Sequence, residues 1–142
     1  MNGPSEFVDT NILVYAHDTS PSVAAKHRAA ADLLSRLWTE RTGSLSTQVF
    51  GEFFTVATKR LASPLSTDEA YRIIEDYSAW TVYTLTSEDI LSAIRIQQRY
   101  QLSFWDALIL RSAQALGSLV LWSEDLNAGQ EIHGVRILNP FA

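Results

Sequence analysis

The sequence contains no cysteine, which excludes both a disulfide framework and a thiol nucleophile. It also lacks any apolar run long enough to cross a bilayer. Its first residues have neither the basic start nor the long apolar stretch of an export signal. Together these absences predict a protein of the reducing cytoplasm that has no membrane association.

Basic residues are scarce. The sequence has 11 Lys and Arg against 16 Asp and Glu, so the formal net charge is −5. An acidic protein binds nucleic acid poorly by itself, because phosphates need cationic partners. That objection loses its force if divalent cations sit among the acids, since two Mg²⁺ ions would almost neutralise the chain. The charge therefore points to a metal if the ligand is a nucleic acid.

The pattern of apolar residues predicts one α/β domain over residues 1–142. Apolar side chains are spread evenly, without repeats, linkers or low-complexity tracts. Short β-branched or aromatic segments alternate with segments of helical periodicity. We expect strands at 7–8, 44–46, 81–85, 119–122 and 135–138, and helices at 11–16, 23–38, 48–61, 67–77, after 87 and at 104–116. This alternation is typical of a mostly parallel central sheet flanked by helices.

Hydroxyl residues precede four of these helices and are the expected N-caps, because their side chains can accept a hydrogen bond from the first turn. They are Ser46 or Thr47, Thr67, Ser87 and Ser103.

Two acids follow predicted strands. Asp9 comes directly after the first strand, and Asp125 comes three residues after the strand at 119–122. Open parallel sheets bind ligands beyond the carboxyl ends of their strands. Both acids are therefore expected at one edge of the sheet. The alternative is that each acid shapes a turn or caps the following helix, which is a common use of Asp.

Glu52 lies inside a predicted helix and borders its apolar stripe. A carboxylate there needs a partner, because burying it alone is costly. The alternative is that it reaches solvent or pairs with Lys59 or Arg60. The neighbouring Gly51 is unfavourable inside a helix, and we expect it to allow close approach of another backbone.

Asp106 lies in the first turn of its helix, on the same side as Ile109 and Ala113. The segment from Ser103 to Asp106 resembles a capping box, which would account for the acid without any function. The helix N-terminus favours the ionised carboxylate in either case. Four carboxylates without cysteine suit Mg²⁺ or Mn²⁺ better than zinc.

Four segments resemble the acidic motifs of PIN domains, in that family's order and spacing over nearly the whole chain. They are Asp9-Thr10-Asn11, Phe50-Gly51-Glu52-Phe53, Phe104-Trp105-Asp106-Ala107 and Ser123-Glu124-Asp125. The resemblance implies a PIN-like fold in which the four acids meet at one end of the sheet. It also implies hydrolysis of phosphodiester bonds, usually in RNA, by metal-activated water.

The residues that the resemblance makes functional follow from these motifs. Asp9, Glu52, Asp106 and Asp125 would be the catalytic, metal-binding acids, and Asn11 and Ser123 would support them. Asn127 stands where some members carry a further acid, so the sequence leaves open whether the site binds one metal ion or two.

Small single-domain members are most often toxins of bacterial toxin–antitoxin pairs, and this chain is similar to the VapC toxins of type II pairs. This similarity implies a ribonuclease that forms a homodimer and is blocked by a small antitoxin protein. Two alternatives are a PIN-type nuclease in RNA processing or DNA cleavage, and a non-catalytic binding module. The retention of four acids disfavours the binding module. Lys59, Arg60, Arg95 and Arg99 are the candidates for RNA contacts, and Trp105 is the aromatic candidate.

Overall fold

Strands and helices alternate along the chain in a computed structural model that describes residues 4–142. The strands are β1 (Glu6–Val8), β2 (Gly43–Ser46), β3 (Thr81–Tyr83), β4 (Val120–Trp122), β5 (Glu131–Ile132) and β6 (Val135–Leu138). The helices are α1 (Thr10–His17), the 3-10 turn η1 (Pro21–Val23), α2 (Ala24–Glu40), α3 (Thr47–Lys59), α4 (Thr67–Tyr77), α5 (Ser87–Tyr100) and α6 (Phe104–Ala115). Residues 1–3 lie outside the described residues. They belong to the expected domain and to the N-terminal stretch in which the sequence shows no export signal.

The strands form one sheet in the order β3-β2-β1-β4-β6-β5. All neighbouring pairs are parallel except β5 and β6, which are antiparallel. The carboxyl ends of β1 and β4, which are neighbours, therefore point to the same edge of the sheet. This arrangement confirms the predicted α/β fold with a mostly parallel sheet.

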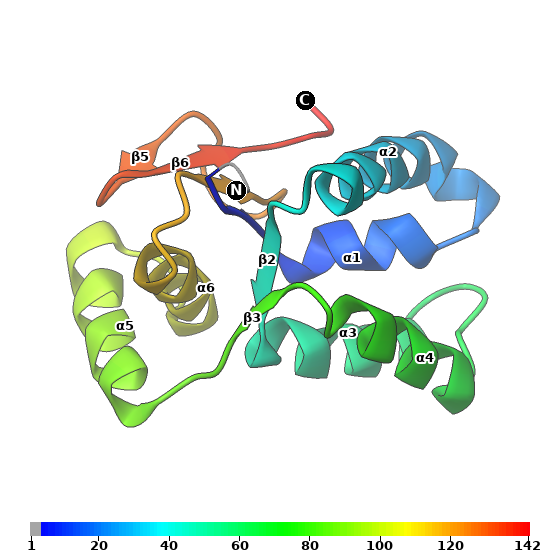
Figure 1. The fold of residues 1–142 in the computed structure, drawn as a ribbon, viewed down its shortest axis with the longest axis horizontal. Helices are drawn as coiled ribbons and strands as arrows, with labels where there is room; N and C mark the ends of the chain where they lie inside the picture. Colours follow the sequence, from blue (N-terminus) through cyan, green and yellow to red (C-terminus); the bar gives the residue numbers. More distant parts are fainter. Residues whose placement is uncertain (1–3) are drawn as a thin grey trace.

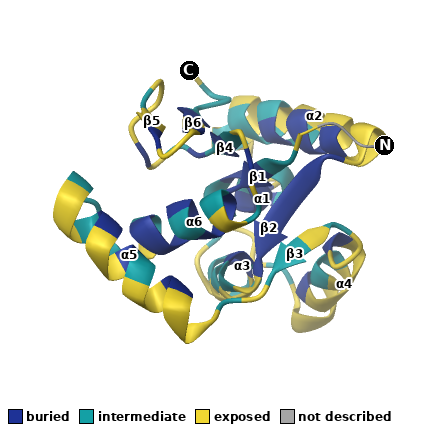
Figure 2. Ribbon diagram, turned by 60° about the vertical axis from the view of Figure 1, so that its left-hand side comes forward, coloured by how far each residue is buried: buried dark blue, intermediate teal, exposed yellow. Residues whose placement is uncertain are grey.

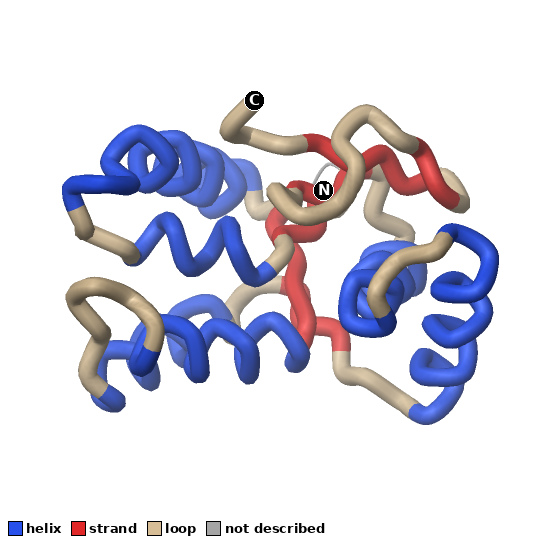
Figure 3. Tube along the Cα trace, turned by 180° about the vertical axis from the view of Figure 1, so that it is seen from behind, coloured by secondary structure: helices blue, strands red, loops and turns tan. Residues whose placement is uncertain are grey.

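Helices cover both faces of the sheet (Figure 1). On one face α6 contacts β2, β4 and β6, and α5 packs against α6. On the other face α2 and α3 contact β2, while α1 packs between α2 and α3. Seen from behind, the central strands run between the two groups of helices, and the β5–β6 end of the sheet lies above α5 and α6 (Figure 3).

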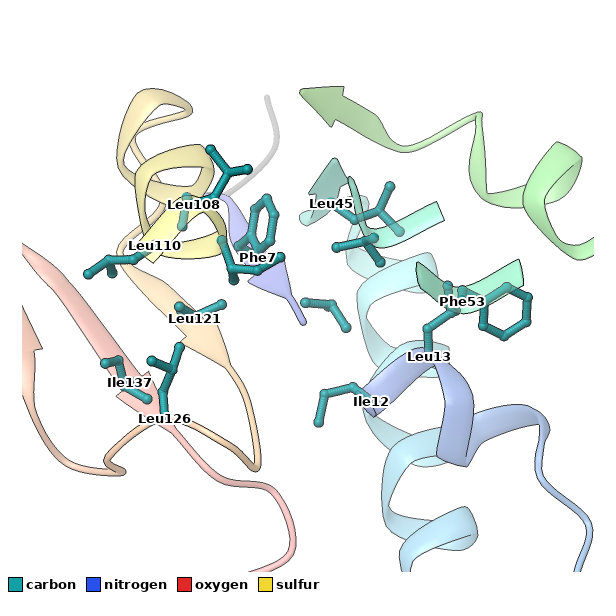
Figure 4. Packing of buried hydrophobic residues seen from close by; sticks show 14 of the residues in the cluster. Phe7, Ile12, Leu13, Leu45, Phe53, Leu108, Leu110, Leu121, Leu126 and Ile137 are labelled. Carbon is teal, nitrogen blue, oxygen red and sulfur yellow. The ribbon is translucent and has the colours of Figure 1, made fainter. Parts of the chain in front are cut away.

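The core lies between the sheet and these helices (Figure 4). Phe7, Leu45, Leu121 and Ile137 from four strands are fully buried, as is Leu108 from α6. Each such side chain contributes about 1.5–3 kcal/mol on burial. Strand β2 is buried along its whole length, whereas α5 exposes its outer side (Figure 2). The strand ends that carry the acids are therefore anchored in a packed core.

The N-cap residues of two helices lie one position earlier than predicted. Ser66 rather than Thr67 caps α4, and Thr86 rather than Ser87 caps α5. Only the earlier residue of each pair has an acid three positions later, and that carboxylate accepts a hydrogen bond from the cap's backbone N–H at 3.0 and 2.8 Å. The reciprocal bond of the capping box therefore selects the earlier residue.

Strand β5 was not predicted, and β3 ends at Tyr83 rather than at residue 85. Strand β5 pairs with β6 through a two-residue turn in which His133 and Gly134 have φ of 52° and 81°. Such turns need positive φ at both positions, which Asn-Gly signals more strongly than His-Gly. None of the helices within residues 4–142 has the length and apolar character that spanning a membrane requires.

Candidate active site

A cleft of about 700 Å³ opens beside the carboxyl ends of β1 and β4. All four predicted acids line it, and each comes from a different part of the fold. Asp9 joins β1 to α1, Glu52 lies in α3, Asp106 lies in the first turn of α6, and Asp125 follows β4. The fold thus brings together carboxylates that are up to 116 residues apart in the sequence.

Asp9 is held firmly at the base of the cleft, where only 4% of it is exposed. Its backbone N–H donates to the Trp122 carbonyl at 2.9 Å, which continues the pairing of β1 with β4. One carboxylate oxygen accepts from the Thr10 N–H at 2.7 Å and so caps α1. The other accepts from the Ser123 hydroxyl at 2.7 Å. The alternative of a helix cap is therefore correct for Asp9, but the cap uses only one of its two oxygens.

The surroundings of Asp9 disfavour its charge. Burial raises its pKa to about 7, and the nearby charges of Asp125 and Asp106 add to that increase. The Ser123 hydroxyl and the Thr10 N–H oppose it. Among residues 4–142, no basic side chain forms an ion pair with Asp9. A buried carboxylate without a counter-charge is a site that a bound cation would stabilise.

Asn11 and Ser123 connect Asp9 with Asp125. The Asn11 amide nitrogen donates to Asp125 at 3.0 Å and to Asp9 at 3.4 Å, and its oxygen accepts from the Glu124 N–H at 3.2 Å. The Ser123 oxygen accepts from the Asp125 N–H at 3.1 Å. Both residues therefore lie where the resemblance expects supporting residues, and they fix the spacing of the two acids.

The alternatives expected for Glu52 were that it reaches solvent or pairs with Lys59 or Arg60. It is partly exposed but forms no ion pair with either residue. It accepts a hydrogen bond from the Thr10 hydroxyl at 2.7 Å, and Gln48 approaches its second oxygen at 3.5 Å. Sequence reasoning gave Thr10 no role, although it stands between Asp9 and Asn11 in the first motif. Its position directly after a cleft acid, at the start of a helix, was the available signal.

The reason expected for Gly51 is wrong. A Cβ at this position would have no neighbouring atom within 4 Å, so no backbone approaches closely. Gly51 is exposed and lines the cleft beside Glu52. It keeps this part of the cleft free of a side chain, at a cost to α3 of about 1 kcal/mol relative to alanine.

Ser103 and Asp106 form only one of the two hydrogen bonds of a capping box. The Ser103 oxygen accepts from the Asp106 N–H at 3.1 Å, but in the described part of the chain no bond returns from the Ser103 N–H to the carboxylate. Burial raises the pKa of Asp106, and the charge of Asp125 adds to the effect while Ser103 opposes it. The N-cap of α6 is Ser103, so the Asp106 carboxylate is not needed for capping.

The carboxylate oxygens of the cleft fit a hard divalent cation, although they do not lie close enough together to form a complete coordination site. Within residues 4–142, no three acidic or histidine side chains lie close enough together to form a ready-made metal centre. The Asn11 amide lies between two of the four carboxylates instead. All four side chains offer oxygen ligands at one cleft, which is the chemistry that Mg²⁺ and Mn²⁺ prefer.

The cleft extends from the acids along the neighbouring helices α1 and α3. Apolar side chains from both helices form its walls, among them Val14 and Val56, and Arg60 and Leu61 lie at the end of α3. Trp105 lines the opposite end, next to Asp106, and is 59% exposed. The cleft is therefore longer than a single phosphate group needs.

Comparison with known families gives one match. The family model described as "PIN domain" matches residues 7–130, which is most of the chain and includes all four acids of the cleft. No curated protein matches the sequence significantly.

Known structures with the same fold include three proteins of low sequence identity. A toxin–antitoxin complex from Klebsiella pneumoniae has a TM-score of 0.68 and 21% identity over 96% of this chain and 98% of its own. VapC20 from Mycobacterium tuberculosis, described as a toxin that cleaves the sarcin–ricin loop, has a TM-score of 0.64 and 22% identity over 82% and 87%. VapBC2 from Rickettsia felis, bound to a DNA fragment from its promoter, has a TM-score of 0.66 and 16% identity over 94% and 97%.

Proposed function

The chain belongs to the PIN domain family, and from that premise we propose that it is a Mg²⁺- or Mn²⁺-dependent endoribonuclease. One observation carries the proposal. Four carboxylates from four separate parts of the fold line a single cleft, and the most buried of them, Asp9, has no basic partner among the described residues. An arrangement that costs folding energy in this way is typical of a site built to hold a cation.

Asp9, Glu52, Asp106 and Asp125 would hold the metal. When bound, Mg²⁺ or Mn²⁺ supplies a lowered pKa for water and neutralises charge on a phosphate. The chain's own residues hold the carboxylates in place. Ser123 and Asn11 keep Asp9 and Asp125 at a fixed spacing, and Thr10 orients Glu52.

RNA is the substrate that we propose for this cleft. An acidic cleft repels phosphate unless a cation neutralises it, so binding of the strand should depend on the metal. The M. tuberculosis protein with the same fold is described as cleaving the sarcin–ricin loop. That description supports an RNA substrate.

The direct test is cleavage of a labelled RNA with and without Mg²⁺ or Mn²⁺. Asp9→Asn and Asp106→Asn should abolish cleavage while circular dichroism shows a folded protein. Asp32→Asn is the matched control, because Asp32 is exposed on α2 and does not line the cleft. A mock purification without the protein should show no nuclease activity. If it shows none, full activity of either cleft variant would contradict the assignment.

We further propose that the nuclease is the toxin of a type II toxin–antitoxin pair and is blocked by a small antitoxin protein. An acidic cleft attracts a basic segment, and an arginine could bind Glu52 or Asp106 through two hydrogen bonds and so compete with metal. The structural relatives described as a toxin–antitoxin complex and as a toxin support this proposal. A homodimer stays a prediction, which sedimentation of the purified protein would test.

Induced expression in a bacterial host tests the toxin role. The wild type should arrest growth with loss of RNA, the Asp9→Asn variant should not, and the product of an adjacent gene should restore growth. Harmless expression of a protein that still cleaves RNA in vitro would instead favour the alternative of a PIN nuclease in RNA processing.

A further inference from the structure

Arg60 is the single cationic side chain that lines the cleft within residues 4–142. Five other lining side chains are carboxylates, so the cleft as a whole is strongly acidic. A lone arginine in such a place would be expected to pair with one of these acids. The structure shows that it does not.

Arg60 is exposed, and its guanidinium forms no ion pair or side-chain hydrogen bond with any residue from 4 to 142. Only the backbone of Arg60 has a structural task, because its N–H donates to the Val56 carbonyl at 2.8 Å and ends α3. The charge of Arg60 is therefore available to an external anion.

The position of Arg60 separates that anion from the four acids. Glu52 and Arg60 are eight residues apart on α3, which corresponds to about 12 Å along the helix axis. The lining side chains between them on this helix, Thr55 and Val56, are uncharged. Asp18 at the end of α1 is buried, one of its oxygens accepts from the Ser20 N–H at 3.0 Å, and it forms no ion pair with Arg60 among residues 4–142. Arg60 and Glu52 thus stand more than two helical turns apart on α3, which favours separate phosphates for Arg60 and for the acids.

We propose that Arg60 binds a backbone phosphate of the RNA strand, at a distance from the phosphate that is cleaved. The inference rests on the proposed ribonuclease function and adds a binding residue to it. Arginine suits this task because its planar guanidinium can donate two parallel hydrogen bonds to phosphate oxygens. The apolar walls of α1 and α3 guide the strand between the two points, and a metal neutralises the acidic end.

Lys59 provides a closely matched control. It is the neighbouring residue, it is exposed and carries the same charge at the same end of α3, but it does not line the cleft. Arg60→Gln and Lys59→Gln therefore change the net charge of the protein and its long-range field almost identically. A difference between the two variants reports a local contact.

The experiment combines kinetics with binding. In Mg²⁺, Arg60→Gln should raise KM for RNA about tenfold with kcat unchanged, as expected when a contact made equally in the ground and transition states is lost. Lys59→Gln should change KM less than twofold. Binding of a fluorescent mixed-sequence single-stranded RNA is measured in the Asp106→Asn background, where no cleavage is expected. There, Arg60→Gln should make the slope of log affinity against log salt shallower by about 0.7.

The outcomes separate the two proposals. If the unaltered protein neither binds nor cleaves RNA, the proposed function is wrong and the role of Arg60 falls with it. If it cleaves RNA but Arg60→Gln and Lys59→Gln behave alike, only the role of Arg60 is overturned. A fall in kcat at constant KM for Arg60→Gln would also overturn it, because that result belongs to a group acting on the reacting phosphate.

Discussion

The Ser123 hydroxyl donates to the Asp9 carboxylate at 2.7 Å, although the two residues are 114 positions apart in the sequence. The contact follows from strand pairing. Val8 lies opposite Trp122 in the parallel pair of β1 and β4, so the next residue of each strand leaves the sheet at the same level. The register of two short strands therefore sets the relative position of Asp9 and Asp125.

Ser123→Ala should destabilise the protein and weaken its metal site. The change removes a hydrogen bond to a buried carboxylate, which costs about 1–3 kcal/mol and lowers Tm by about 3 °C per kcal/mol. The loss should be larger at pH 8 than at pH 5.5, because Ser123 stabilises the ionised form of Asp9. Mg²⁺ affinity, measured by calorimetry, should fall about tenfold or more.

Ser112→Ala is the control for this change. Ser112 is also fully buried, but it donates to the Leu108 carbonyl within α6 and does not line the cleft. Its loss should lower Tm equally at both pH values and leave Mg²⁺ affinity unchanged. An equal response of the two serine variants would contradict a specific role for Ser123.

The metal-free protein should become less stable as pH rises from about 4 to about 7. Burial raises the pKa of Asp9 to about 7, whereas the unfolded chain releases this proton near 4. Between these values the folded state holds more protons, so the free energy of unfolding decreases as pH rises and levels off above pH 7. Chemical denaturation in EDTA at several pH values measures this, and Asp9→Asn should flatten the profile.

Divalent metal should reverse that loss. At 100 times its dissociation constant, Mg²⁺ or Mn²⁺ stabilises the folded state by about 2.7 kcal/mol. We expect a matching rise in Tm at fixed ionic strength for the unaltered protein and for Asp32→Asn. Asp9→Asn should show little of the rise. No rise in the unaltered protein would mean that the carboxylates do not share a metal.

The sequence was most informative where chain topology alone decides the outcome. Asp9 and Asp125 were expected at one edge of the sheet because parallel strands place their carboxyl ends together, and the structure brings them to one cleft. The fold class followed from the alternation of segments in the same way. These inferences need no knowledge of side-chain packing, only the order and type of the elements.

The sequence was least informative where long-range packing decides. Whether Gly51 meets another backbone depends on how α3 sits beside its neighbours, and it faces open space instead. Four basic residues were equal candidates for contact with RNA, and only the path of α3 distinguishes Arg60 from Lys59. Strand β5 is two residues long and forms only because β6 is there to pair with it.

Trp105 should contribute to RNA binding by stacking on an unpaired base. It is 59% exposed beside Asp106, and the Gln48 amide donates to its backbone carbonyl at 3.2 Å, which holds this end of the cleft in place. Stacking on an aromatic side chain is worth about 1–3 kcal/mol per base. Trp105→Leu should therefore weaken binding of single-stranded RNA by about tenfold, while Trp105→Phe keeps most of the affinity because it keeps an aromatic face.

Both variants should retain the Tm of the unaltered protein, since a largely exposed ring adds little to the core. Fluorescence anisotropy in the Asp106→Asn background measures the affinity. Equal binding by the leucine and phenylalanine variants would show that the ring does not stack on a base.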